Sequence, residues 1–307
     1  MAAISAIVET NHRDVVHDAE MNFYGSRLAT CASDHIIKVF EVKPTGQSHA
    51  MAELSGHEGP VWQVCWSFPF SDKGEYLASC SHDRKVFIWK EVGNKWTRIY
   101  EYTQHEASIN SVAWAPSTYG LIFACGSTDC TISIVTNYDD IWKPAKIFNA
   151  HDQGVNAVSW APAKGSRTVI NVNETILPKR VVSGGNDKMV KVWKEVSEEK
   201  WELDIQLEGH QDWVRDVAWA PVESYNHFTI ASCGSDGLVI IWRTDNIEAK
   251  VWRKQILCRA EVPVYNVSWN SNGTVLAVAF SDNRVALYQE RTQNNWVPIT
   301  EAVSEQN

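Results

Sequence analysis

The chain has few basic residues for its length and lacks the short motifs that mark many enzyme and metal sites. Its 307 residues include 28 Lys and Arg against 37 Asp and Glu, which gives a net charge of −9. This acidic balance argues against binding to a phosphate backbone, so we expect no direct nucleic-acid partner. The sequence contains no phosphate-cradling glycine loop, no Gly-x-Ser-x-Gly turn and no metal-ligand spacing. We therefore expect no cofactor-binding and no metal site.

Cysteine usage and hydropathy also exclude several classes of protein. Seven cysteines form an odd number without a Cys-x-x-Cys pair, and Cys80, Cys125 and Cys233 fall in expected strands. A reduced thiol packs there as a small apolar residue, which favours a reducing compartment. The N-terminus lacks a basic region followed by an apolar core, and no apolar run reaches membrane-spanning length. Any role at a membrane is therefore expected to be peripheral.

What the sequence does contain is one pattern present in six copies. In the clearest copy, His210 is followed at the fourth, seventh and ninth positions by Val214, Val217 and Trp219. Repeat periods of about 40 to 50 residues are typical of propellers and arrays. The other copies begin at His12, His57, His105, His151 and, where the His is lost, Ala260.

A second pattern and the tryptophans divide each copy into strands. An Asp is followed six residues later by an aromatic residue in five copies: Asp34/Phe40, Asp83/Trp89, Asp187/Trp193, Asp236/Trp242 and Asp282/Tyr288. In the third copy Val135 follows Asp129. A further Trp opens the last strand of five copies: Trp96, Trp142, Trp201, Trp252 and Trp296.

These patterns predict four strands per repeat, which in the fifth copy are 213–219, 228–233, 238–243 and 251–257. The apolar run from Leu238 to Trp242 has apolar residues on both parities, so its strand should be covered on both faces. The step from Val214 to Val217 changes parity, which places the first Val in a turn or bulge. A four-stranded sheet buries both faces when it stacks around an axis. The sequence therefore predicts an all-β, six-bladed WD-repeat propeller.

We expect a single domain over residues 1–307. The repeats lie at about 12–58, 57–104, 105–150, 151–208, 210–258 and 260–303. Residues 163–179 are predicted to insert between the first two strands of repeat four as a surface loop, and the tail from Ser304 is predicted to be disordered.

Residues 4–9 are predicted as an additional strand that precedes the first repeat. Repeat six is complete by itself, because its fourth strand is expected from Trp296 to about Val303. The strand at 4–9 then either latches onto blade six or blade one of a closed ring, or it is the outer strand of a seventh blade that is otherwise missing. In the second case the uncovered sheet surface is suited to strand donation by another chain.

Repeated His, Ser and Asp residues invite a catalytic interpretation. A triad needs a nucleophile, a base and an orienting acid within hydrogen-bond reach. The set recurs once per blade with a Trp as fourth member, so a structural hydrogen-bond network is the better explanation, and we predict no catalytic residue and no enzyme. The predicted networks are His57/Ser79/Asp83/Trp89, His151/Ser183/Asp187/Trp193 and His210/Ser232/Asp236/Trp242.

Two tryptophans lie outside the repeat template, and the network weakens at the two ends of the chain. Trp62 and Trp213 lie near the start of their blades, where with Arg215 they form a candidate rim for peptide contact or simply pack the loop. Repeat six has Ala260 and Val278 in place of His and Ser, and repeat one has Phe40 in place of Trp. Divergence of the repeats explains this loss, as does stabilisation of the end blades by something outside the chain.

Several segments resemble the Sec-thirteen family, the small WD-repeat subunit of the outer COPII vesicle coat and of the nuclear pore Y-shaped scaffold. They are His17–Ala19, Tyr24–Cys31, Gly56–Val64, Ser111–Pro116, Asn156–Pro162 and, above all, Asp212–Pro221. The similarity spans about residues 4–300. Repeat six departs from the family, because Ala279–Asp282 and Tyr288 replace a Gly-rich turn and a Trp.

The resemblance implies an open propeller and a non-enzymatic scaffold. A larger COPII outer-coat subunit, or a scaffold nucleoporin of the Y-complex, would insert a β segment as the seventh blade and form a hetero-oligomer. The implied locations are the cytoplasmic face of the ER membrane, COPII vesicles and the nuclear envelope. The alternatives are a closed peptide-binding adaptor, such as a substrate receptor, and the paralogous pore-scaffold propeller. The expected partner-blade interface comprises Ile4, Ala6, Ile7, Val8, Val16, Ala19, Val264 and Val267.

Overall fold

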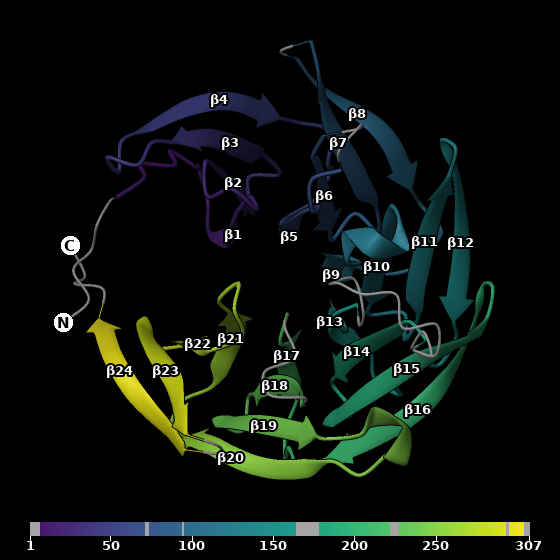
Figure 1. Cartoon of the computed structure of the whole chain (residues 1–307). Helices are drawn as coiled ribbons and strands as arrows, with labels where there is room; N and C mark the ends of the chain where they lie inside the picture. The colour runs from purple at the N-terminus through teal and green to yellow at the C-terminus, as the bar shows by residue number, and fades with distance from the viewer. Residues whose placement is uncertain are drawn as a thin grey trace, which may run out of the picture. The chain divides into compact units, whose positions relative to one another are not determined.

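The chain is an all-β six-bladed propeller of WD-repeat type, built from six antiparallel four-stranded sheets. The computed structural model describes residues 7–70, 74–93, 95–163, 178–221, 227–292 and 295–303. In Figure 1 the strands of each blade follow one another across the sheet in chain order, for example β17 to β20 in green. Two compact units divide the chain, and each holds three blades: an N-terminal unit, Ala3–Phe148, and a C-terminal unit, Asn149–Asn307 with Met1–Ala2.

The N-terminal unit holds blades 1 to 3. Blade 1 consists of β1 (Val16–Met21), β2 (Arg27–Ala32), β3 (Ile37–Val42) and β4 (Ser48–Leu54). Blade 2 consists of β5 (Val61–Trp66), β6 (Tyr76–Ser81), β7 (Val86–Val92) and β8 (Lys95–Tyr102). Blade 3 consists of β9 (Ile109–Trp114), the 3-10 turn η1 (Ser117–Tyr119), β10 (Ile122–Ser127), β11 (Ile132–Tyr138) and β12 (Ile141–Ile147).

The C-terminal unit holds blades 4 to 6. Blade 4 consists of β13 (Val155–Trp160), β14 (Arg180–Gly185), β15 (Met189–Ser197) and β16 (Lys200–Glu208). Blade 5 consists of β17 (Val214–Trp219), β18 (Phe228–Gly234), β19 (Leu238–Thr244), the 3-10 turn η2 (Ile247–Ala249) and β20 (Arg253–Arg259). Blade 6 consists of β21 (Val264–Trp269), β22 (Val275–Phe280), β23 (Arg284–Thr292) and β24 (Asn295–Val303).

The aspartate of the second pattern shapes the turn between the second and third strands. In blade 5 the Asp236 carboxylate accepts the Leu238 amide at 3.0 Å, and Gly237 between them has φ of 71°. A Cβ on Gly237 would overlap with the Ala260 carbonyl oxygen, so only glycine fits at this place. The carboxylate bond to the residue two positions on recurs in all six blades. The Asp is therefore first of all a turn residue.

The first Val of each repeat lies at a β-bulge, as its parity predicts. In blade 5 the register shifts between Val214 and Asp216, so Val214 and Val217 both point into the core and are buried. A register shift occurs near the start of the first strand in every blade. The strand over Leu238–Thr244 is buried at every residue, which confirms that it is covered on both faces.

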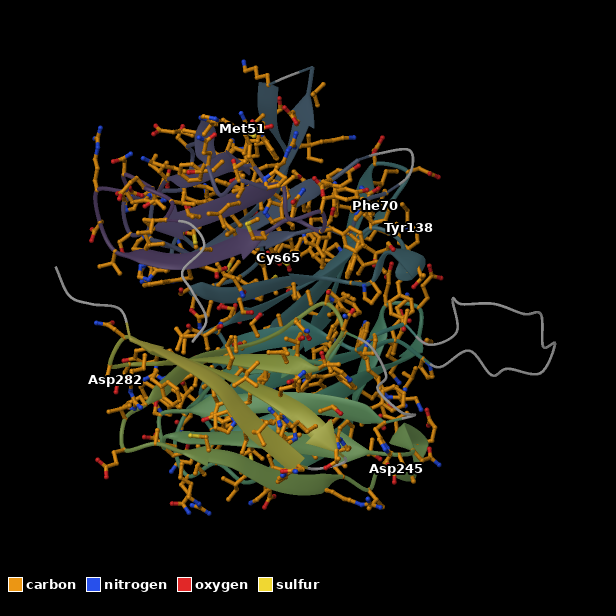
Figure 2. All side chains as sticks on the ribbon, turned by 60° about the vertical axis from the view of Figure 1, so that its left-hand side comes forward. Met51, Cys65, Phe70, Tyr138, Asp245 and Asp282 are labelled. Carbon is orange, nitrogen blue, oxygen red and sulfur yellow. The ribbon has the colours of Figure 1, made fainter. Side chains whose placement is uncertain are left out.

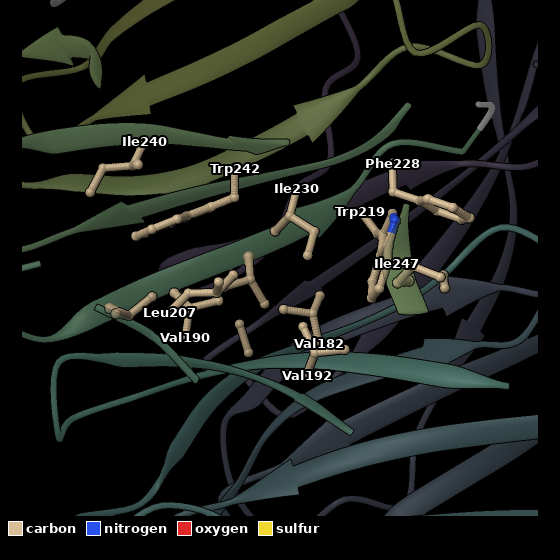
Figure 3. Packing of buried hydrophobic residues seen from close by; sticks show 14 of the residues in the cluster. Val182, Val190, Val192, Leu207, Trp219, Phe228, Ile230, Ile240, Trp242 and Ile247 are labelled. Atoms are coloured by element: carbon tan, nitrogen blue, oxygen red, sulfur yellow. The ribbon is translucent and has the colours of Figure 1, made fainter. Parts of the chain in front are cut away.

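Within each unit the core lies between neighbouring blades. Figure 3 shows side chains of blade 4, such as Val182 and Val192, facing Ile230 and Trp242 of blade 5. First strands lie inside and fourth strands at the edge: Figure 2 shows Met51 of β4 at the periphery of the N-terminal unit, with Cys65 of β5 further inside. The Trp at the ninth position of the repeat is the last residue of the first strand in blades 2 to 6.

The strand predicted at the C-terminal end of the chain is formed, whereas the strand predicted at the N-terminal end is not formed in its described part. The fourth strand of repeat six is confirmed, because β24 pairs with β23 along its length. The strand predicted at 4–9 is not formed at residues 7–9, where no sheet edge pairs with the backbone; Ile7 is 74% exposed and Val8 is half-buried. Ile4 and Ala6, residues 164–177 of the insertion and the tail from Ser304 lie outside the described residues.

Candidate functional site

The predicted four-residue sets come together in blades 2, 4 and 5. In blade 5, His210 Nδ1 lies 3.1 Å from the Asp236 carboxylate, and its Nε2 lies 2.8 Å from Ser232 Oγ. Trp242 Nε1 donates to the same Ser232 oxygen at 2.8 Å. The set therefore ties the loop before the first strand to the second strand, the third strand and the turn between them.

Blade 2 has the same set with the same contacts. His57 Nδ1 lies 2.8 Å from the Asp83 carboxylate, and its Nε2 lies 2.8 Å from Ser79 Oγ. Trp89 Nε1 donates to that Ser79 oxygen at 3.0 Å. The His57 ring also stacks on Phe87, with 4.0 Å between the ring centres, so the network continues into the apolar core.

Blade 4 repeats the arrangement once more. His151 Nδ1 lies 2.7 Å from the Asp187 carboxylate, and its Nε2 lies 2.7 Å from Ser183 Oγ. Trp193 Nε1 donates to the Ser183 oxygen at 2.8 Å. A Cβ on Gly185 would collide with the His151 ring, so a glycine allows the ring to lie this close to the second strand.

This geometry supports a structural role for the sets. Ser79, Ser183 and Ser232 are fully buried, and an indole N–H already occupies each serine oxygen, so none of these hydroxyls can meet a substrate. The sets therefore present no open nucleophile. They hold each blade together, because a buried polar group is stable only when it is paired.

Burial also sets the charge of the members. It lowers the pKa of His57 and of His151, which keeps both rings neutral. Burial opposes ionisation of Asp83, but hydrogen bonds from His57 and from backbone amides outweigh it and hold the pKa of that carboxyl below its usual range. The neutral His57 ring and the ionised Asp83 carboxylate thus form a hydrogen-bonded pair whose single negative charge lies on Asp83.

Blades 1 and 3 contain variants of the set that the sequence patterns missed. In blade 1, Thr30 replaces the serine and lies 2.9 Å from His12 Nε2. In blade 3 the acceptor moves to the next strand, where Ser133 Oγ lies 3.0 Å from His105 Nε2 and accepts the Tyr102 hydroxyl at 2.8 Å. A pattern that allowed Ser or Thr on either the second or the third strand as partner of the His would have found Thr30 and Ser133.

Blade 1 has an uncovered face on its first strand. Val16 is 42% exposed and Met21 is 41% exposed, and Ala19 between them is exposed as well. The equivalent residues of blade 2, Val61 and Trp66, are 0% and 5% exposed because blade 1 packs on them. Val16 and Ala19 were predicted to meet a partner blade, and both are open to one.

The other side of β1 faces blade 2 and carries two carboxyl groups. Asp18 accepts the amide of Val64, and Glu20 accepts the amide of Trp66. Burial raises the pKa of Asp18 to about 6. Burial, together with the neighbouring Asp18 charge, raises the pKa of Glu20 to about 8.

Blade 6 also has an uncovered face, but on different residues from those predicted. Val264 and Val267 are 0% and 3% exposed and pack against blade 5, because the first and second Val of a repeat meet the preceding blade. Their assignment to a partner interface is therefore corrected. The open face comprises the exposed Tyr265, Asn266, Ser268 and Val285 and the half-buried Ala277, Ala279 and Leu287.

Comparison with blade 5 shows that this face is unusual. The residues of blade 5 in the same register are Ala231, Cys233, Val239 and Ile241, and none is more than 1% exposed. Val285 of blade 6, the equivalent of Val239, is 41% exposed. An apolar strand pair that is covered in blade 5 is therefore open in blade 6.

The predicted rim residues separate into two places. Trp62 is half-buried, and its Nε1 donates to Ser108 Oγ at 2.9 Å, so it packs a loop. Trp213 is 43% exposed, and the Arg215 guanidinium lies 4.9 Å from its ring centre and 5.8 Å from that of Tyr265. Tyr265 was missed, although it follows the first Val of its repeat as Arg215 does.

The described residues contain no cluster of three or more His, Cys, Asp or Glu side chains that could hold a metal ion. Across the same residues, no helix is long and apolar enough to cross a membrane.

Comparison with known proteins gives matches along nearly the whole chain. The family model "WD domain, G-beta repeat" matches residues 49–90, 96–135, 142–194 and 201–243. The model "Anaphase-promoting complex subunit 4 WD40 domain" matches residues 226–300.

Three similar curated proteins illustrate the relationship. The "Protein SEC13 homolog" of Drosophila melanogaster is 42% identical over 305 residues, which cover 97% of this chain and 84% of the relative. That of Dictyostelium discoideum is 45% identical over 297 residues, or 95% of this chain and 97% of the relative. The "Protein transport protein sec13" of Emericella nidulans is 40% identical over 311 residues, or 97% of this chain and 98% of the relative.

Proposed function

Because the chain belongs to the SEC13 family of WD-repeat proteins, we propose that it is a structural subunit of a protein-transport coat. The family consists of structural components and not of enzymes. We propose specifically that it belongs to the outer coat of COPII vesicles, in ER-to-Golgi transport, and has a second role in the nuclear pore Y-complex. The chain then works at the cytoplasmic face of the ER membrane and at the nuclear envelope, and reaches membranes only through the coat.

The observation that carries the proposal is the pair of uncovered blade faces. The N-terminal unit leaves Val16, Ala19 and Met21 open on β1, and the C-terminal unit leaves Val285 and its neighbours open on blade 6. Each of these faces is suited to cover by a strand of an inserted blade. Exposed apolar sheet surface of this kind is a liability in a free monomer, and a partner strand that covers it gains affinity from the burial.

The partner in this proposal is the larger COPII outer-coat subunit or a scaffold nucleoporin, which donates the inserted blade. The exposed Ile7 and the backbone of residues 7–9, which pairs with no strand among the described residues, offer a further edge for that blade. Interfaces that complete a fold typically bury more than about 2,000 Å² and are apolar. The resulting hetero-oligomer stiffens its rod-like partner.

Co-expression with the larger coat subunit tests this function. We expect a stable complex whose melting temperature exceeds that of the chain alone, because binding to the folded state adds stability. A photo-crosslinker at Ile7→Cys should label the larger subunit. Crosslinks from position 7 only to residues 296–303 of the same chain would support a self-closed ring, and full thermal stability of the free chain without gain from the partner would contradict the insertion.

One observation favours a second candidate, a closed propeller that captures peptides as a substrate receptor does. Trp213, Arg215 and Tyr265 form an exposed aromatic and cationic cluster, which is the composition of binding hot spots. Changing Trp62 and Trp213 together to Ala abolishes partner capture under this hypothesis and leaves it intact under the first. A third hypothesis, the paralogous pore-scaffold propeller, predicts capture of nucleoporins without the larger coat subunit.

A further inference from the structure

Neighbouring blades within each unit are joined by a repeated set of hydrogen bonds between their first strands. At the junction of blades 1 and 2, Asp18 Oδ2 accepts the Val64 amide at 3.1 Å and Glu20 Oε2 accepts the Trp66 amide at 2.8 Å. Asp18 and Glu20 are the sixth and eighth residues after the His of their repeat. The earlier blade therefore supplies acceptor side chains at alternate positions, and the later blade supplies backbone amides.

At the junctions of blades 2 and 3, 4 and 5, and 5 and 6, the acceptor also lies at the sixth or the eighth residue after the His, but its residue type differs. Bonds run from the Val112 amide to Gln63 Oε1 (2.8 Å), from the Trp219 amide to Ser159 Oγ (3.0 Å) and from the Val267 amide to Asp216 Oδ2 (3.0 Å). Carboxylate, amide and hydroxyl oxygens all serve, because each accepts an N–H. What is shared is the position of the acceptor and not its residue type.

A tryptophan completes three of these four junctions. The indole that ends the later strand donates to the backbone carbonyl eight residues after the His position of the earlier blade. The pairs are Trp66 to Glu20 (3.1 Å), Trp114 to Cys65 (2.9 Å) and Trp269 to Ala218 (3.0 Å). The strand that docks onto a blade is thus recognised by its amides and by a terminal indole N–H.

The first strand of blade 6 has acceptors at the same two positions, but within the described part of its unit no blade follows it. Asn266 and Ser268 are the sixth and eighth residues of their repeat, and both are exposed. The side-chain N–H₂ of Asn266 donates to Asp216 Oδ2 at 2.8 Å, which directs its amide oxygen to the other side. In the described part of the C-terminal unit, no strand follows β24.

We infer that Asn266 and Ser268 are the specificity-determining acceptors for the first strand of the inserted blade. This inference rests on the proposed function, and it continues the series of blade-to-blade interfaces within the chain. The partner strand donates two alternate backbone amides to Asn266 Oδ1 and Ser268 Oγ, and an indole N–H to the Ser268 carbonyl. The segment that docks on blade 6 is a β-strand of another chain. It has apolar residues at its first and fourth positions and a Trp at its sixth, like Val264, Val267 and Trp269 of β21.

The apolar positions of that pattern follow from the junction of blades 5 and 6. There Val264 and Val267 pack on Cys233 and Val239 and their neighbours. The same place on blade 6 is the open surface of Ala277, Ala279, Val285 and Leu287. Two apolar side chains of the partner strand cover it, while the polar contacts to β21 fix the register of the strand.

Binding of the full chain to the larger COPII outer-coat subunit tests the inference. The double variant Asn266→Ala/Ser268→Ala should bind roughly tenfold to thirtyfold more weakly, because two amides of the partner strand lose their acceptors. The variant Asn266→Gln/Ser268→Thr, which keeps both acceptors as Gln63 and Ser159 do, should bind within about threefold of the native chain. Ser271→Ala, at an exposed residue of the following turn, is the matched control and should change nothing.

The outcomes separate this inference from the proposed function. Since both residues are exposed, each variant alone should melt within about 2 °C of the native chain. If the native chain does not bind the subunit, the proposed function and the inference both fail. If it binds and the double Ala variant binds equally well, the inference alone is overturned. A photo-crosslinker at Ser268→Cys should label a partner strand that ends in Trp, and a crosslink to any other segment would also overturn it.

Discussion

Blade 5 and blade 6 contain the same four strands but hold them together differently. Blade 5 has the complete set of His210, Ser232, Asp236 and Trp242, and both of its faces are buried. Blade 6 has Ala260, Val278 and Tyr288 at the corresponding places, and one of its faces is open. Blade 5 thus adds a polar network to a sheet that is covered on both faces, whereas blade 6 is held by apolar contacts with blade 5 and leaves its other face open.

A buried charge at equivalent positions should separate the two blades most strongly. Val239→Asp should cost more than about 4 kcal/mol and unfold the C-terminal unit, because Val239 is fully buried. Val285→Asp should cost about 0.5 kcal/mol, because Val285 is 41% exposed, yet it should abolish binding of the partner blade. Urea unfolding and a pull-down with the larger coat subunit measure both; comparable losses of stability in the two variants would contradict the comparison.

The aromatic anchors should differ by a smaller amount. Trp242→Ala removes a buried ring and leaves Ser232 Oγ without its indole donor, at a cost of about 3 to 5 kcal/mol. Tyr288→Ala, in the half-buried position of blade 6, should cost about 1 to 2 kcal/mol. Urea denaturation of the free chain gives both values. The difference should remain when the partner blade is bound, because Tyr288 packs toward blade 5 and not on the open face.

The recurrent geometry of the turn aspartate allows a third comparison. Asp236 accepts bonds from His210 and from the amides of Gln211 and Leu238, so Asp236→Ala should cost about 2 to 3 kcal/mol. Asp282 is exposed and pairs with Arg284, and Ala260 stands where its repeat would have a His, so Asp282→Ala should cost less than about 0.5 kcal/mol. Equal losses of unfolding free energy would show that the turn bond, and not the His contact, is what matters.

The repeat pattern predicted the strands and networks because both depend on local spacing. The bulge at Val214, the Trp at the end of the first strand in blades 2 to 6 and the His–Ser–Asp contacts follow from residues within one blade. The partner face of blade 6 was misplaced, because the spacing of Val264 and Val267 does not say which neighbour they meet. That depends on how one blade packs on the next. Alignment of Val285 with the buried Val239 carries the missing signal.

The buried histidines should make the networked blades sensitive to acid. The folded pKa of His57 and of His151 lies below 6.5, so the unfolded chain binds more protons as the pH falls through 6.5. The free energy of unfolding should therefore be about 1 kcal/mol per histidine lower at pH 5.5 than at pH 7.5. Urea unfolding of His151→Gln should show a smaller loss over this range. Blade 6, which has no such His, should add nothing to the slope, so Ala260→Gln serves as control.

The smallest expected effect concerns the chemistry of the acceptors, which are ionisable carboxyl groups at the first junction and non-ionisable side chains on β21. The folded pKa of Glu20 is raised from 4.5 to about 8, so its contribution to stability is present below pH 4.5 and lost as the pH rises through 8. Gln at this position still accepts the Trp66 amide but carries no charge. Glu20→Gln should therefore gain about 1 kcal/mol of stability relative to the native chain between pH 7 and pH 9. The exposed Glu41→Gln should show no such difference in urea unfolding at the two pH values. A buried carboxyl acceptor that ionises near pH 8 thus makes a junction sensitive to alkali, and the non-ionisable Asn266 and Ser268 leave the proposed partner junction free of that sensitivity.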